Sequence, residues 1–235
     1  MKKIPILITF LFIITPVFSQ VKKPQNLPAY DYKRLHFGFT IGLNTMDFGV
    51  RRPAIHDSSI FADVSRISPG FQVSIVSDLR LADYFSLRFL PGITFGQRKL
   101  YFYEVVGEDY LFDRKMEIES NFIDFPLVVK YKSKRVNNYA PYFIAGGSVR
   151  YDLAARKEYE AGSNIYVRLK PFDFYFELGF GIDTYLQYFK FSPELKVSTG
   201  FRNVLVSDPA QGYPQYVNSI NRLNSYIVML CFHFE

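Results

Sequence analysis

Eight segments of this chain alternate apolar and polar residues with a period of two, and the connections between them run long, short, long, short. In the clearest segment, large apolar residues occupy every second position from Phe172 to Ile182. Successive side chains of a β-strand point to opposite faces, so this segment has one apolar and one polar face. The predicted strands are Leu35–Asn44, Phe71–Leu79, Phe85–Gly96, Ile123–Lys132, Pro141–Asp152, Phe172–Asp183, Phe189–Phe201 and Tyr226–Phe234.

The lengths of the connections favour a membrane barrel. Residues 47–68 and 98–119 form long connections, whereas 81–84, 133–138 and 184–188 form short ones. Outer-membrane barrels have short periplasmic turns and longer extracellular loops. A sheet embedded in lipid must also close, because an open edge leaves backbone groups unpaired. We therefore predict an all-β fold, an eight-stranded antiparallel up-and-down transmembrane β-barrel over residues 35–235.

The alternative is a soluble barrel with a ligand cavity. Its outer faces would have to expose about twenty Phe, Leu and Ile side chains, more than a solvated surface tolerates. The polar faces suit a wet or salt-bridged lumen, because both signs of charge lie on them. These predicted lumen residues are Arg88, Asp124, Lys130, Arg150, Asp152, Asp173, Glu177, Asp183, Lys190, Glu194 and Lys196. Opposite charges in so narrow an interior will pair, so we expect a porin-like architecture without useful conduction.

The N-terminus has the features of an exported protein. Two lysines precede the apolar run Ile4–Val17, which is typical of a secretory signal peptide, and we place cleavage after Ser19. Residues 1–19 are thus the expected signal peptide and residues 20–34 a periplasmic N-terminal arm. The expected location is the cell outer membrane, with its lipid as one partner. The net charge of +6 is mild, and with no aromatic–basic module we expect no nucleic-acid partner.

Few residues of this chain indicate catalysis or metal binding. The chain has three histidines and one cysteine, Cys231, which by parity faces the lumen of the barrel. His56 precedes an acid and two serines in the first long loop, but adjacent positions rarely converge on one site. His36 and His233 lie near the ends of strands that pair on closure. We expect no enzyme, no cofactor, no metal site and no small-molecule substrate.

Two groups of residues are candidate partner contacts. The turn after the fourth strand is basic and could meet an acidic partner or simply form a solvated face; its residues are Lys130, Lys132, Lys134 and Arg135. The first and last long loops supply the other candidates, which are Arg51, Arg52, Tyr213 and Tyr216.

The chain resembles the PorT family of outer-membrane barrels. The matching segments are HFGFTIGLN (36–44), NFIDFPLVVKY (121–131), PYFIAGGSVRYDL (141–153), FELGFGIDTYLQYFKFSPELKVSTGF (176–201) and SINRLNSYIVMLCFHFE (219–235). The resemblance implies an accessory or assembly component of type IX protein secretion, linked in some relatives to gliding motility, with other envelope secretion proteins as partners. The alternative is a stand-alone OmpA-like barrel that binds a surface ligand or stabilises the envelope.

Overall fold

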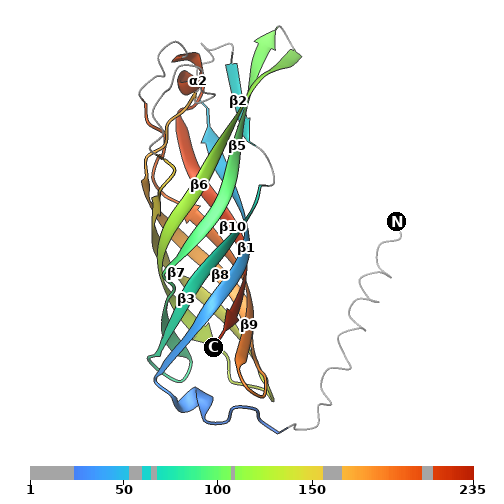
Figure 1. The fold of residues 1–235 in the computed structure, drawn as a ribbon, viewed down its shortest axis with the longest axis vertical. Helices are drawn as coiled ribbons and strands as arrows, with labels where there is room; N and C mark the ends of the chain where they lie inside the picture. The colour runs from blue at the N-terminus through green and yellow to red at the C-terminus, as the bar shows by residue number, and fades with distance from the viewer. Residues whose placement is uncertain (1–23, 53–59, 65–67, 107–108, 156–165, 208–213) are drawn as a thin grey trace, which may run out of the picture.

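The computed structural model describes residues 24–52, 60–64, 68–106, 109–155, 166–207 and 214–235. These residues form a tall barrel of tilted strands, with a short helix at one end and the N-terminal arm at the other (Figure 1). The strands are β1 (Leu35–Arg51), β2 (Ile60–Val64), β3 (Pro69–Arg80), β4 (Phe85–Phe89), β5 (Gly92–Val106), β6 (Asp109–Lys132), β7 (Tyr139–Asp152), β8 (Phe172–Tyr185), β9 (Lys190–Gly200) and β10 (Arg222–Phe234). The helical elements are the 3-10 turn η2 (Tyr30–Tyr32) and the α-helix α2 (Pro214–Asn218).

The strands close into a ring of eight. All strand pairings among the described residues are antiparallel, and β1 pairs with both β3 and β10. β4 and β5 occupy one position in the wall, since each pairs with β3 on one side and β6 on the other. Pro91 interrupts them, because proline has no N–H to donate to the ladder. β2 pairs with β5 outside the ring. The predicted eight-stranded barrel is confirmed.

The wall is apolar outside and polar inside. On β8, Phe174 and Leu178 are 45% and 51% exposed, whereas Asp173 and Glu177, each the preceding residue, are buried. Exposed apolar side chains of this kind extend around the barrel on β1, β3, β6 and β7 as well. Such a surface is stable against lipid and not against water.

At the extracellular end, the apolar residues change faces. On β5, Ile93 points outward, but further along the strand Leu100 and Phe102 point inward and are fully buried. On β1, Leu43 points outward and Met46 and Phe48 inward. A wall that has left lipid must hide its apolar groups inside, so this change marks the outer boundary of the membrane-spanning part.

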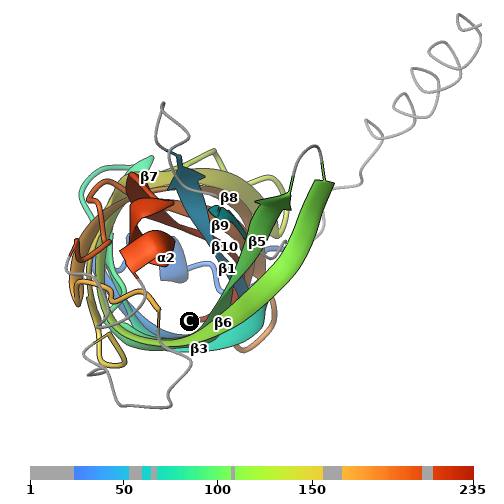
Figure 2. The same cartoon turned by 90° about the horizontal axis from the view of Figure 1, so that it is seen from above.

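The connection predicted over residues 98–119 is a hairpin rather than a loop. β5 runs on to Val106 and β6 starts at Asp109. The sequence prediction stopped early because it followed the outward-facing apolar row, which ends where the apolar residues turn inward. Seen from above, the end of this hairpin leans away from the ring (Figure 2).

An apolar core closes the extracellular mouth. α2 buries Tyr216 and Val217, and Tyr216 stacks edge-on against Phe102 with 4.8 Å between ring centroids. Tyr166 and Leu205, from the last two long connections, complete the same cluster. Figure 2 shows α2 lying within the outline of the ring. Neither α2 nor any other described helix is long and apolar enough to cross a membrane.

Candidate functional site: the charged lumen and its periplasmic mouth

Ion pairs between neighbouring strands build a charged cluster inside the lumen. Arg150 on β7 lies 3.0 Å from Asp124 on β6 and 2.7 Å from Glu177 on β8. Lys196 on β9 lies 3.0 Å from the second oxygen of Glu177, and the hydroxyl of Thr94 donates a hydrogen bond to Asp124. Five strands therefore contribute to one buried cluster of both charges.

A second cluster lies nearer the periplasm. The guanidinium of Arg88 lies 2.9 Å from Asp78, 3.0 Å from Glu235 and 3.6 Å from Glu194. His233 lies 3.3 Å from the same Glu194. The Arg88 side chain is fully buried, so each of these carboxylates compensates for hydration that the guanidinium has lost.

The sequence predicted this filling of the interior. All the lumen residues predicted above are buried. The space between them is small: one cavity beside Lys196 and His233 has a volume of about 10 Å³ and another at the periplasmic mouth about 30 Å³. A single water molecule needs roughly 10–15 Å³, so these two cavities have room for water molecules and for nothing larger.

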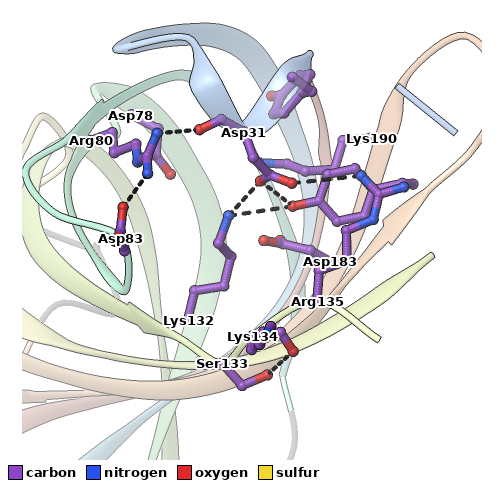
Figure 3. Close-up of polar contacts among 12 residues, drawn as sticks. Asp31, Asp78, Arg80, Asp83, Lys132, Ser133, Lys134, Arg135, Asp183 and Lys190 are labelled. Atoms are coloured by element: carbon purple, nitrogen blue, oxygen red, sulfur yellow. Dashed lines mark hydrogen bonds and ion pairs between the residues drawn. The ribbon is translucent and has the colours of Figure 1, made fainter. Parts of the chain in front are cut away.

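The basic turn at the periplasmic mouth contacts the chain's own arm. Lys132 lies 2.6 Å from Asp31, and Arg135 lies 3.6 Å from the other carboxylate oxygen (Figure 3). The hydroxyl of Tyr185 donates to Asp31 over 2.7 Å. Lys134 is exposed at the turn. The sequence left open whether this turn meets an acidic partner or forms a solvated face; in the structure, Asp31 of the arm places an acidic group against it.

The structure places Lys130 inside the barrel, which corrects its prediction as a partner contact. It belongs to β6 rather than to the turn and is 2% exposed. Its ammonium lies 2.8 Å from both carboxylate oxygens of Asp183, inside the barrel. The alternation of the strand points this side chain into the lumen, where a protein partner does not reach it.

Further contacts fix the arm, described from residue 24 onward, across the periplasmic mouth. Arg80 donates to the backbone carbonyl of Asp31 over 2.6 Å, and the backbone N–H of Asn26 donates to the Asn138 side chain over 2.9 Å. Tyr30 stacks on His36 with 4.1 Å between ring centroids. The arm therefore docks through charge, backbone and ring contacts on several strands. The sequence showed only its length and its prolines.

The electrostatics of Asp31 favour the docked arm. Burial alone raises the pKa of this carboxyl, but the hydrogen bond and charge of Lys132, together with Tyr185 and Arg135, outweigh burial. The pKa of Asp31 therefore lies below its ordinary value of 3.8. The carboxylate is ionised at neutral pH and attracts both cations of the turn.

The predicted extracellular contacts have different environments. Arg51 and Arg52 are exposed, and the guanidinium of Arg52 lies 3.6 Å above the ring centre of Phe61. Tyr216 is only 2% exposed, and its hydroxyl donates to Asp113 over 2.7 Å, so its predicted partner contact is corrected to a core position. Burial and the Asp113 carboxylate raise the pKa of Tyr216 to about 12. Tyr213 lies outside the described residues.

Two of the three histidines and the cysteine make structural contacts. His233 pairs in register with Thr40 rather than with His36, and its ring lies 2.6 Å from the Thr40 hydroxyl. Cys231 faces the lumen, as predicted, and accepts a hydrogen bond from Gln72. His56 and residues 1–19 lie outside the described part of the chain. Among the described residues, no three His, Cys, Asp or Glu side chains group as metal ligands.

A closed antiparallel ring with a lipid-compatible outer belt and a charged, filled interior defines an integral outer-membrane β-barrel. Comparison with known protein families supports this assignment to outer-membrane β-barrels. The chain belongs to the family described as outer membrane protein beta-barrel domain, whose model matches residues 18–206. The protein is therefore located in the outer membrane.

One solved structure aligns with this chain at low sequence identity. The outer membrane protein OprG from Pseudomonas aeruginosa aligns with a TM-score of 0.43 and 12% sequence identity, over 84% of this chain and 94% of OprG. No curated protein matches this chain.

Proposed function

We propose that this barrel is an accessory or assembly component of type IX protein secretion and acts through its surfaces rather than through its lumen. One observation supports this mode of action: buried ion pairs fill the interior, and one of them joins Arg88 on β4 to Glu194 on the opposite strand β9. An apolar core lies above these pairs and a docked arm below. The assignment to secretion rests on the resemblance of five sequence segments to the PorT family. Its partners are then other envelope secretion proteins.

The test is deletion of the gene in a host that exports cargo with C-terminal sorting domains. Extracellular cargo activity should fall, with cargo accumulating in the periplasm, and the wild-type gene supplied in trans should restore export. Total cell-surface protein must be compared in parallel, so that a general envelope defect is distinguished from a secretion defect. Export at the wild-type level in the deletion strain would refute the proposal.

A second candidate function is that of a stand-alone barrel that binds a surface ligand or stabilises the envelope. The hairpin of β5 and β6, which projects beyond the ring, favours ligand binding (Figure 2). In that case deletion leaves export intact and changes adhesion or envelope permeability.

We also propose that the protein is not an enzyme and takes no cofactor, nucleic acid or small-molecule substrate. His36 stacks on Tyr30, and His233 contacts Thr40 and Glu194, so each has a structural role. Substitution of His56 by alanine should leave the lipid composition of the outer membrane unchanged, as measured by mass spectrometry.

A further inference from the structure

Three basic side chains gather at the extracellular end of the barrel wall, where β8, β9 and β10 lie side by side. Arg222 begins β10, and its guanidinium donates to the backbone carbonyl of Phe201 over 2.5 Å. Arg202 is the next residue after Phe201 and is exposed. Lys170, which precedes β8 by two residues, is exposed as well. We call these three side chains the outer basic cluster; its members are Lys170, Arg202 and Arg222.

Hydrogen bonds to the connection after β9 hold the cluster together. The backbone N–H of Lys170 donates to the carbonyl of Val204 over 2.8 Å, and the N–H of Val204 donates to the carbonyl of Leu223 over 3.0 Å. The Lys170 ammonium also donates to the carbonyl of Asn203 over 3.4 Å. The connection that carries Arg202 therefore lies between Lys170 on one side and the start of β10 on the other.

The outer basic cluster lies directly above the lipid-facing belt of the wall. Phe201, which is 60% exposed, immediately precedes Arg202 in the chain. Phe172, the first residue of β8 and 37% exposed, lies two residues after Lys170. The surface therefore changes from aromatic to basic within two residues at both places. A membrane changes from hydrocarbon to headgroups over a similarly short distance, so the cluster faces the headgroups of the outer leaflet.

The charge of the cluster is not neutralised within the part of the chain that the structure describes. Lys170 and Arg222 donate to backbone carbonyls there, and none of the three side chains forms an ion pair with a described carboxylate. Asp173 accepts a hydrogen bond from the backbone N–H of Arg202 over 3.2 Å, but its own side chain is buried. A fourth cation, Arg51, is exposed and stands opposite Arg222 in the strand ladder. This surface therefore carries a net positive charge where it meets the outer leaflet.

We propose that the outer basic cluster binds the phosphate groups of lipopolysaccharide in the outer leaflet. The ligand has to place anions directly above an apolar layer. The phosphorylated sugars of lipid A do so, with their acyl chains beside Phe172 and Phe201. Guanidinium groups match phosphate oxygens in charge and geometry, and basic residues near an anionic membrane surface add attraction. An acidic protein segment would neutralise the cations but leave the rings beneath them to other lipids. This proposal is independent of the role in secretion, because it rests on the barrel wall alone.

The test compares lipid A that carries its phosphates with the same lipid A after enzymatic dephosphorylation. Binding of each to the full-length barrel in detergent micelles is measured by native mass spectrometry. We expect the phosphorylated form to bind at least about tenfold more tightly, because only it brings anions to the three cations. Equal binding of the two forms would overturn the proposal. Binding of phosphatidylglycerol or of inorganic phosphate as tight as that of phosphorylated lipid A would also overturn it, since the site would then accept any anionic lipid or a free anion.

Variants separate the cluster from general attraction to a positively charged protein. Arg202→Gln combined with Arg222→Gln should weaken binding of phosphorylated lipid A about tenfold and leave binding of the dephosphorylated form unchanged. The exposed Lys170→Gln, which leaves the strand ladder untouched, should weaken it in the same direction by a smaller factor. The matched control is Lys33→Gln with Arg34→Gln, which removes two exposed charges at the periplasmic end and should change neither affinity. Circular dichroism must show the same strand content in all variants. Unchanged binding in both cluster variants, or an equal loss in the control, would refute the proposal.

Discussion

Arg150 shows how much of this molecule depends on single buried charges. Its guanidinium binds Asp124 and Glu177 from the two neighbouring strands, and its side chain is 1% exposed. Such pairs do not make a protein more stable than apolar packing would. They make it intolerant of losing one partner, because the remaining charge is left buried without compensation.

Substitution of Arg150 by methionine should therefore destabilise the barrel by about 3–5 kcal/mol. The measurement is urea unfolding in lipid vesicles. Unfolding is monitored by gel electrophoresis, as the loss of the difference in migration between unheated and heated samples (heat-modified migration). Arg51→Met, at an exposed position of β1, is the matched control and should change the free energy of unfolding by less than about 0.5 kcal/mol. A similar small effect for both variants would contradict the proposed importance of the pair.

Asp31 gives a pH-dependent prediction. Because its pKa is lowered in the folded protein, its carboxylate stabilises the docked arm above the ordinary value of 3.8, and this stabilisation is lost as the pH falls through the lower folded pKa. A spin label on Ala29→Cys should be ordered at neutral pH and become mobile as the pH falls below about 4. The buried Cys231 should not react with the label.

The control for this experiment is Asp31→Asn, which keeps the shape of the side chain but not its charge. In that variant the label should be more mobile at neutral pH and should lose its response to acid. An ordered label in both proteins at all pH values would show that Asp31 does not hold the arm.

Among the elements, β5 shows what the sequence could predict and what it could not. Where Ile93 faces lipid, the alternation of apolar and polar residues identified the strand correctly. Beyond Gly96 the buried residues Leu100 and Phe102 face inward, so the outward apolar row that defined the strand ended although the strand did not. Period-two alternation gives the faces of a strand, but which face is apolar depends on whether the surroundings are lipid or water.

The docking of the arm could not be predicted for a different reason. Asp31 meets Lys132 and Tyr185 only because three segments far apart in the chain converge at one mouth. No local pattern marks such a meeting. The lumen residues, by contrast, were predicted because one strand's alternation is enough to place them.

The apolar cluster at the extracellular mouth should unfold independently of the membrane-spanning part of the barrel. Phe102→Ala removes a fully buried ring from the apolar cluster, at a cost of about 3–5 kcal/mol, whereas Tyr103→Ala alters the outward face of the same strand. We expect protease added outside intact cells to cleave the Phe102 variant faster than the Tyr103 variant. Heat-modified migration should persist in both. Equal cleavage rates would mean that this cluster does not hold the outer segments.

For the whole molecule, we predict that the barrel does not conduct ions across the membrane. Deleting residues 24–34 removes the arm but leaves the Lys130–Asp183 and Arg150–Glu177 pairs and the outer core in place. Planar-bilayer recordings of the full chain and of this deletion should both lack stable conductance steps. Regular steps in the full chain would contradict the closed lumen. Steps in the deletion alone would make the arm the only barrier.

The pairing of β1 with β10 sets the order in which this barrel can be made. The two strands stand at opposite ends of the barrel sequence, so the last seam forms only after β10 has been synthesised and exported. Until then both strands have free edges, and their apolar faces have no lipid to meet. The chain must cross the periplasm unclosed, and its maturation is limited by the time for which those edges can be kept apart from other chains.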